Sequence, residues 1–304
     1  QDDASVPYLK RGHWYYSRYA AGAEYPVHAR RAGSLDAPEQ VMLDVAALAR
    51  GHDFFEIGEL EVSPDNRLLA YAEDTVGRMQ YTLRFKDLAS GQLLPDEIAN
   101  VEPSVAWAAD NRTVLYIEKD PQTLLGHRVR KHVLGTDPRQ DPLVFDEPDD
   151  SFYVEVGTTK DGRYVWIYSL STVSSEQRYA EASDPKLAFR VIVPRERDHE
   201  YFADHFDGRW IIRSNWQAPN FRLVEVSLGD AADRSRWRDL VAHRGDAFVD
   251  GFSVFRGFLA IEERSGGLRK VRIRPWSGGK DFYIASDEPA YLAELGDNEV
   301  VDSH

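Results

Sequence analysis

The residues of this chain that could perform nucleophilic chemistry do not form a known catalytic pattern. The serine nucleophile of an α/β-hydrolase lies in a Gly-x-Ser-x-Gly turn between a strand and a helix. The nearest string here, GFSVF at 251–255, ends in Phe255 and is predicted to lie in a strand. Asp302, Ser303 and His304 have the residue types of a catalytic triad, but consecutive residues cannot adopt its geometry. The sequence therefore predicts no catalytic residue in this chain.

The nine histidines show no metal-binding or cofactor pattern. There is no His-Glu-x-x-His, no Gly-x-Gly-x-x-Gly and no Walker loop, so we expect neither a metal nor a cofactor. His127 and His132 lie in a segment rich in arginine and lysine, which predicts a cationic surface stretch. His205 precedes the pair Asp207-Gly208, and we expect a local hydrogen bond within that turn.

Four carboxylates remain as candidates for binding substrate. They precede the polar turns of a repeated unit whose first strand should line a central channel. A ring of acidic groups there would attract cationic ligands, because low-dielectric walls focus the field. The alternative is that they are turn residues and hydrogen-bond partners between repeats. The four channel candidates are Glu59, Glu61, Glu155 and Asp250.

A repeat explains where these residues fall. Five segments share a polar turn followed by a strand rich in aromatic and β-branched residues, and a weaker sixth lies at 9–19. The spacings between equivalent turn positions are 45, 51, 46 and 49 residues. Asp-Asn and Asp-Gly pairs tolerate the positive φ of tight hairpin turns. The turn positions are Asn66, Asn111, Gly162, Gly208 and Gly257.

Two hairpins in each period make a four-stranded antiparallel unit, which cannot bury both of its faces alone. Radial stacking of such units predicts an all-β, seven-bladed type of β-propeller, and a β-sandwich would not repeat one turn at an even interval. We expect one domain over 1–304 and a short helical turn at 44–50. Blades are predicted at 8–45, 54–98, 101–147, 150–196, 198–243 and 245–286, with an incomplete seventh beginning near Glu288.

Aromatic residues recur at similar places in the repeat, and we interpret them as packing between blades. Trp166 and Trp210 are expected to be nearly buried. The full set is Tyr71, Trp107, Tyr116, Tyr164, Trp166, Tyr168, Trp210 and Phe252.

Composition excludes several classes of protein. A net charge of −14 without a concentrated basic face argues against nucleic-acid binding. No apolar run reaches the roughly 18–20 residues of a membrane helix, and the start has no signal peptide. The absence of cysteine agrees with a reducing compartment, so a cytoplasmic location is expected. The start, without an initiator methionine, is typical of a piece of a longer chain.

Three long segments, 6–31, 43–98 and 107–150, resemble the propeller of oligopeptidase B (protease II), within the prolyl oligopeptidase family of serine peptidases. The resemblance extends over nearly the whole chain. It implies a propeller that covers an α/β-hydrolase domain, admits only short peptides and hinges against that domain.

That hydrolase domain would be the partner, and it would hold the catalytic triad and the acidic residues that select Arg or Lys. Short basic peptides would be the substrates of this serine endopeptidase, and the present chain alone should be inactive. A freestanding TolB-like scaffold for protein–protein interaction is the alternative. An α/β-hydrolase sequence downstream in the gene would decide between them.

Overall fold

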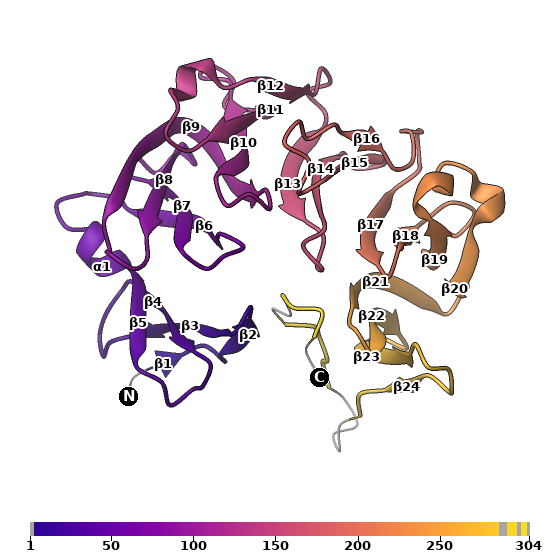
Figure 1. Ribbon diagram of the computed structural model, residues 1–304. Coiled ribbons are helices and arrows are strands. Elements are labelled where there is room, and N and C mark those ends of the chain that lie inside the picture. Colours follow the sequence, from indigo (N-terminus) through magenta and orange to yellow (C-terminus); the bar gives the residue numbers. More distant parts are fainter. Residues whose placement is uncertain (1–2, 286–290, 297–298, 303–304) are drawn as a thin grey trace. The chain divides into compact units, whose positions relative to one another are not determined.

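Hairpins joined by short polar turns make up most of the chain. The structure is a computed structural model that describes residues 3–285, 291–296 and 299–302 (Figure 1). Helix in these residues is limited to short segments, as expected for an all-β protein. They are α1 (Val45–Leu48) and three 3-10 turns, η1 (Pro138–Gln140), η2 (Leu228–Asp230) and η3 (Arg234–Arg236). The predicted turn at 44–50 is thus confirmed, and the Asp44 side chain caps it by accepting from the amide of Ala47.

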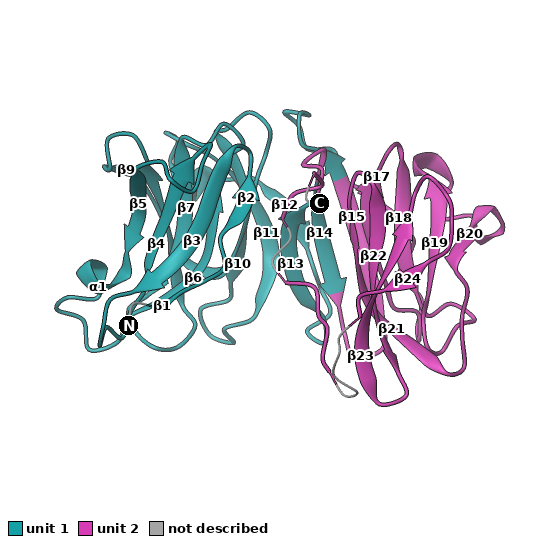
Figure 2. Cartoon of the chain, turned by 90° about the horizontal axis from the view of Figure 1, so that it is seen from below, with its two compact units in different colours: residues 1–158, 165–169, 180–188 teal, residues 159–164, 170–179, 189–304 magenta. Residues whose placement is uncertain are grey.

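The chain forms two compact units (Figure 2). Unit 1 comprises residues 1–158, 165–169 and 180–188, and unit 2 comprises 159–164, 170–179 and 189–304.

Two antiparallel sheets belong entirely to unit 1. In the first, the order is β1-β3-β4-β5, with β2 also pairing with β3. Its strands are β1 (Asp3–Ala4), β2 (Tyr8–Lys10), β3 (His13–Tyr19), β4 (Val27–Ala32) and β5 (Glu39–Asp44). The second sheet runs in reverse chain order from β12 to β6. Its strands are β6 (Glu56–Val62), β7 (Leu68–Asp74), β8 (Tyr81–Asp87), β9 (Leu93–Trp107), β10 (Thr113–Lys119), β11 (Gly126–Val133) and β12 (Leu143–Asp146).

The other three sheets have four strands each, in chain order. Residues of the third are divided between the two units, and the fourth and fifth belong to unit 2. The third contains β13 (Tyr153–Thr158), β14 (Tyr164–Leu170), β15 (Ser175–Glu181) and β16 (Arg190–Val191). The fourth contains β17 (Tyr201–Phe206), β18 (Arg209–Ser214), β19 (Arg222–Ser227) and β20 (Arg238–Val241). The fifth contains β21 (Ala247–Val254), β22 (Phe258–Ser265), β23 (Leu268–Pro275) and β24 (Phe282–Tyr283).

Strand β9 differs from the prediction of two separate blades at 54–98 and 101–147. It runs through 15 residues and pairs with β8 along its first part and with β10 along its second. The chain passes from one four-stranded unit to the next without a loop, through Asn100, whose φ is +61°. The Asn100 side-chain amide donates to the carbonyl of Lys119 at 2.6 Å, which fixes this irregular position.

The start of the seventh blade, predicted near Glu288, lies outside the described residues. The described residues of 291–302 contain no strand and pack on the fifth sheet instead. The amide of Arg256 donates to the carbonyl of Val301 at 2.7 Å, and Ala293 and Leu295 contact the cluster around Phe255.

The first hairpin of each blade turns at the position that the sequence repeat predicted. Asn66, Asn111 and Gly162 have φ of +64°, +61° and +70°. Asp207 and Gly208, at +49° and +76°, form a two-residue turn with positive φ at both positions, as in type I′ hairpins. Gly257 is the exception, because its φ is not positive.

Replacing Gly208 by alanine is expected to lower the free energy of unfolding by about 1–2 kcal/mol, since an added Cβ disfavours the left-handed conformation. No atom lies within 4 Å of that Cβ, so crowding does not contribute. Gly257→Ala is the matched control, with equal space but ordinary φ. It should be neutral or stabilising by up to about 1 kcal/mol in urea unfolding. Equal losses for the two variants would contradict this account.

Most of the aromatic packing is confirmed. Tyr71, Trp107, Tyr116, Tyr164 and Trp210 are at most 4% exposed and lie in the apolar cores of the units.

The expectation that Trp166 is nearly buried is wrong. Its side chain is half-buried, on the face of β14 that it shares with the half-buried Tyr168. Its indole lies against Gly157, where a Cβ would collide with the ring. The indole thus covers the backbone of Gly157, and part of the indole remains exposed to solvent.

Candidate functional site

Two of the candidate carboxylates, Glu59 and Glu61, lie on β6, the first strand of its blade. Glu59 is exposed. Glu61 is half-buried, and its carboxylate lies 3.4 Å from the Nζ of Lys10. The carbonyl of Glu61 accepts from the Nε1 of Trp107 at 2.9 Å. Glu61 therefore connects three parts of unit 1, and Lys10 offsets its charge.

Asp250 lies on β21, and its carboxylate is neutralised more fully than that of Glu61. Both of its oxygens accept from the Nε of Arg264, at 2.9 and 2.8 Å. It borders a small hollow of about 120 Å³ in unit 2, where Arg269 also pairs with Glu294. Asp250 and Glu294 of this hollow are thus each paired with an arginine.

Glu155 is different from the other candidates. It lies on β13 with its side chain exposed, and no hydrogen bond or ion pair joins it to another described residue. Burial nevertheless raises the pKa of its carboxyl above the usual value.

The four candidates are divided between the two compact units. Glu59, Glu61 and Glu155 belong to unit 1, and Asp250 belongs to unit 2. Each lies on the first strand of its blade, as predicted. The acidic ring around a channel stays a prediction.

A second group of polar side chains, absent from the sequence-based candidates, lies at the turns of unit 2. The Nζ of Lys160 donates to the hydroxyl of Ser253 at 2.6 Å and lies 3.3 Å from the ring centre of Phe255. The Asp204 carboxylate accepts from the amides of Lys160 and His205 at 3.1 and 2.8 Å. Burial lowers the pKa of Lys160 to about 8 and raises that of Asp204 to about 6.

The local hydrogen bond predicted for His205 is wrong. Its Nδ1 lies 2.6 Å from the carboxylate of Asp161, in the turn of the preceding blade, and its ring is 1% exposed. On β17, His205 points to the same buried face as Ala203, away from its own turn. Because strand alternation decides this direction, the partner comes from another blade.

Replacing Asp204 by asparagine is expected to raise the free energy of unfolding at pH 7, by on the order of 1–3 kcal/mol. The raised pKa means that the folded chain binds this proton more tightly than the unfolded chain. The unchanged chain therefore loses stability as pH rises from about 4 through 6, and the variant should not. Urea midpoints at pH 4, 5, 6 and 7 measure the slope. Asp207→Asn, with a side chain 78% exposed, is the control, and a wild-type slope for Asp204→Asn would refute the argument.

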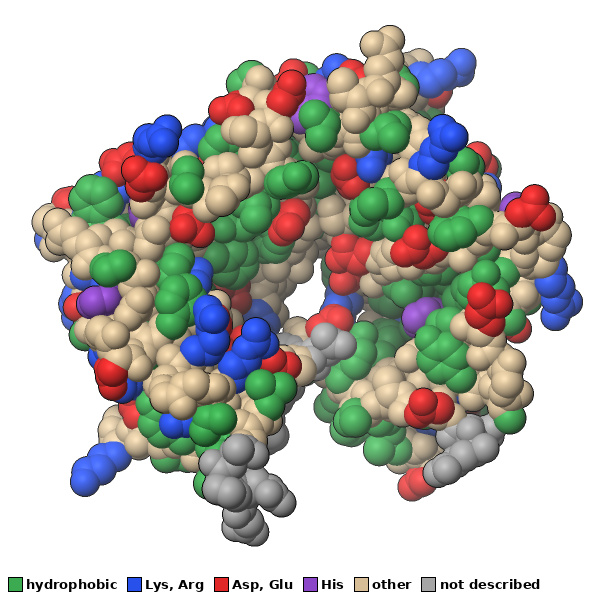
Figure 3. All heavy atoms as spheres, turned by 180° about the vertical axis from the view of Figure 1, so that it is seen from behind, with side chains coloured by type: hydrophobic (Ala, Val, Ile, Leu, Met, Phe, Trp, Pro, Cys, Tyr) green, Lys and Arg blue, Asp and Glu red, His purple; other side chains and the backbone are tan. Residues whose placement is uncertain are grey.

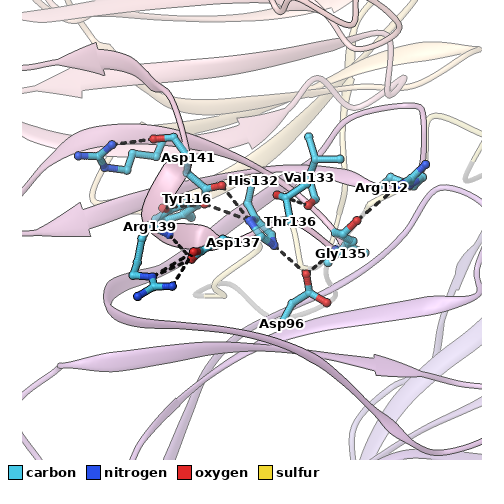
Figure 4. A network of polar contacts seen from close by, with 12 residues as sticks. Asp96, Arg112, Tyr116, His132, Val133, Gly135, Thr136, Asp137, Arg139 and Asp141 are labelled. Carbon is cyan, nitrogen blue, oxygen red and sulfur yellow. Dashed lines mark hydrogen bonds and ion pairs between the residues drawn. The ribbon is translucent and has the colours of Figure 1, made fainter.

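The surface position expected for His132 is also wrong. His127 does lie near the surface and pairs with Asp146 at 3.0 Å, but His132 is 0% exposed. Five residues separate the two on β11, so they point to opposite faces of the strand. His132 lies between two buried carboxylates, with Nε2 at 3.0 Å from Asp96 and Nδ1 at 3.0 Å from Asp141 (Figure 4).

Further bonds complete this buried network (Figure 4). The hydroxyl of Tyr116 donates to Asp141 at 3.0 Å, and the amide of Gly135 donates to Asp96 at 2.6 Å. Both ring nitrogens of His132 thus lie within hydrogen-bonding distance of a carboxylate oxygen, so each polar atom of this buried ring has a partner. The arrangement fixes the segment between β11 and β12, and the side chains of His132, Asp96 and Asp141 are at most 3% exposed.

Another hollow in unit 2, of about 450 Å³, also has compensated charges. Phe206 and Trp276 stack with ring centres 5.0 Å apart, and the guanidinium of Arg209 lies over Trp276 at 5.2 Å. Arg256 pairs with Asp302, and Asp161 pairs with His205. Among the described residues, no group of three metal-ligating side chains could hold a metal ion.

Acidic and basic side chains are interspersed on the face that Figure 3 displays, without a broad basic area. No helix of the described residues is long and apolar enough to cross a membrane.

A family model described as "Prolyl oligopeptidase, N-terminal beta-propeller domain" matches residues 1–298. The chain belongs to the prolyl oligopeptidase family. Its fold is therefore the β-propeller of that family, and the sheets described above are its blades. The predicted all-β propeller of four-stranded antiparallel blades is confirmed.

Relatives within the prolyl oligopeptidase family are peptidases by name. Dipeptidyl aminopeptidase BI of Pseudoxanthomonas mexicana is 50% identical over 314 residues, which are 98% of this chain and 43% of that protein. Protease 2 of Moraxella lacunata is 28% identical over 313 residues, 99% of this chain and 44% of that protein. The chain thus spans less than half the length of these relatives.

Solved structures of the prolyl oligopeptidase family have the same fold. Oligopeptidase B from Leishmania major superposes with a TM-score of 0.91 at 24% identity, covering 99% of this chain and 44% of that one. Oligopeptidase B from Trypanosoma brucei, with covalently bound antipain, has a TM-score of 0.90 at 24% identity and the same coverage.

Proposed function

We propose that this chain is the non-catalytic propeller domain of a serine peptidase that acts on short peptides with a positive charge. The observation that carries the proposal is the family match over residues 1–298 together with a relative at 50% identity named as a peptidase. The partner is a hydrolase domain of the same polypeptide, which supplies the nucleophile and its base. The propeller limits access to that domain, so that only short peptides enter. The family match favours this function over a freestanding TolB-like scaffold.

The names of the relatives suggest two modes of cleavage. A dipeptidyl aminopeptidase removes dipeptides from a free amino terminus, whereas an oligopeptidase cleaves inside a peptide. We propose the first mode, because the relative with that name is 50% identical and Protease 2 is 28% identical. Endopeptidase cleavage after Arg or Lys is the second candidate.

Both the activity and the mode can be tested on the full-length polypeptide with dipeptide amide reporters whose second residue is arginine. Dipeptidyl cleavage requires a free amino terminus, so acetylation of the reporter should abolish turnover. Equal turnover of free and acetylated reporters would support the endopeptidase. Loss of turnover with a serine-directed inhibitor tests the nucleophile, and a full-length protein that cleaves neither reporter would refute the proposed function.

Residues 1–304 alone should hydrolyse neither reporter, because a nucleophile needs a base and an oxyanion hole in fixed geometry. Turnover by this chain that the same inhibitor abolishes would mean that the chain contains an active site.

The acidic balance of the propeller should also speed the capture of cationic peptides. The chain has 51 acidic and 37 basic side chains. Electrostatic steering acts on the encounter rate and is screened over about 8–10 Å at ordinary salt. In the full-length protein, kcat/KM for a peptide with two basic residues should therefore fall more steeply with salt than for a peptide with one. Parallel slopes would contradict steering.

A further inference from the structure

The exposed face of β13 carries an unusual row of side chains. Tyr153 is 70% exposed and Glu155 is exposed, while Val154 and Val156 between and beyond them are buried. Alternate residues of a strand point to the same face and lie about 6.5–7 Å apart. Tyr153 and Glu155 are therefore neighbours on one open face.

The indole of Trp166 lies next to Glu155 in the row of side chains on this face of β13. The next residue on the same face is Gly157, and the ring of Trp166 occupies the place where its side chain would be. Trp166 is half-buried, so part of the indole stays open to solvent. Glu155 consequently stands between two aromatic side chains, all three within unit 1.

The carboxylate of Glu155 has no counter-charge of its own. Lys10 offsets Glu61, and Arg264 offsets Asp250, but no described residue pairs with Glu155. Burial already disfavours its ionised form, as the raised pKa indicates. A bound cation would remove that penalty, so this carboxylate has more to gain from a cationic ligand than its paired counterparts.

The chain around Glu155 adds negative potential. The segment 146–155 contains five acidic residues, and no lysine or arginine occurs from 146 to 159. Asp149 and Asp150 of this segment are exposed. Their field favours a positive ligand over a negative one near β13.

We propose that Tyr153, Glu155 and Trp166 bind the cationic group of the peptide substrate, a primary ammonium or a guanidinium. This inference rests on the proposed function and adds the residues that recognise the positive charge of the substrate. The carboxylate supplies a charge-assisted hydrogen bond, and the ring faces supply cation–π attraction. The same chemistry accepts the α-ammonium of a peptide or the side chain of arginine, and the probes below separate these two sources.

The test measures equilibrium binding to the full-length polypeptide by calorimetry, with three probes. Arginine amide carries both cations, Nα-acetyl-arginine amide only the guanidinium, and citrulline amide only the α-ammonium. Glu155→Gln removes the charge at nearly constant shape, and it should weaken binding of the recognised cation about tenfold or more. A variant effect confined to the probes with an α-ammonium identifies the amino terminus as the ligand. An effect confined to the probes with a guanidinium identifies the arginine side chain.

Asp239→Asn is the control, because Asp239 is a carboxylate outside the four candidates that already pairs with Arg222. It should leave all three affinities unchanged. Tyr153→Leu should weaken binding of the same probe as Glu155→Gln, by about threefold to fivefold. The inference is overturned if Glu155→Gln leaves every affinity unchanged, or if Asp239→Asn has the same effect. Reporter hydrolysis by the unchanged protein is a separate readout, so loss of the proposed function is distinguishable from loss of this site.

Discussion

Replacing His132 by leucine is expected to lower the free energy of unfolding of the chain by about 3–5 kcal/mol. The imidazole ring is 0% exposed, and the side chains of Asp96 and Asp141 are each 3% exposed. Without the ring, two buried carboxyl groups lose the partner that lies between them. Removing one partner of a buried ion pair is costly for this reason, even where the complete pair adds little stability. Urea or guanidinium unfolding followed by far-UV circular dichroism measures the loss.

The strand itself offers the control. His127 lies on β11 as well, but its side chain is 20% exposed and that of its partner Asp146 is 49% exposed. Water screens such a pair, so His127→Leu should cost less than about 1 kcal/mol. Adding Asp96→Asn and Asp141→Asn to His132→Leu should restore part of the lost stability, because the uncompensated charges are gone. Equal costs at positions 127 and 132 would show that the buried network does not depend on charge.

Replacing Trp210 by alanine is expected to cost about 3–5 kcal/mol as well, for a different reason. Trp210 is 0% exposed in the core of unit 2. Its ring centre lies 5.5 Å from that of Tyr164, 4.8 Å from Tyr179 and 5.7 Å from His205. Truncation leaves a cavity among rigid aromatic rings, which cannot collapse to fill it.

Trp210→Phe separates packing from hydrogen bonding. The buried indole N–H has no hydrogen-bond partner among the described residues, so phenylalanine loses volume but no bond. We expect this variant to cost about 1–2 kcal/mol in the same circular dichroism experiment. A loss below about 1 kcal/mol for Trp210→Ala would show that the ring is not part of the core.

Local chemistry explains which parts of the fold could be predicted from the sequence. The turns at Asn66, Asn111, Gly162 and Gly208 depend on residues that tolerate positive φ, and they lie where the repeat predicted them. The partners of His132 and His205 could not be predicted in this way. Asp96 is 36 residues from His132, and Asp161 is 44 residues from His205, so strand register decides that these side chains meet. Asp141 is only nine residues from His132, but it lies beyond the turn that follows β11. The five-residue spacing of His127 and His132 was the one available signal, since it places them on opposite faces of one strand.

The same distinction holds for the candidate site. The sequence predicted carboxylates on the first strands of the blades, because they precede recognisable turns. It could not show that Lys10 offsets Glu61 across 51 residues or that Arg264 offsets Asp250. Tyr153 was not a candidate at all, since a tyrosine in a strand is usually packing. Its exposure depends on how the neighbouring strands cover β13.

Strand β9 has a consequence for how the chain comes apart. Repeat proteins can lose one module at a time where each module ends in a loop. The second and third blades are not separated by such a loop, because β9 pairs with β8 in one blade and with β10 in the other. Unfolding either blade alone would therefore leave about half of β9 without its hydrogen-bond partners. Amide protons of β6 to β12 should therefore exchange with solvent deuterium as one cooperative group. For protein engineers, the smallest piece of this region that could be cut out and moved is a pair of blades.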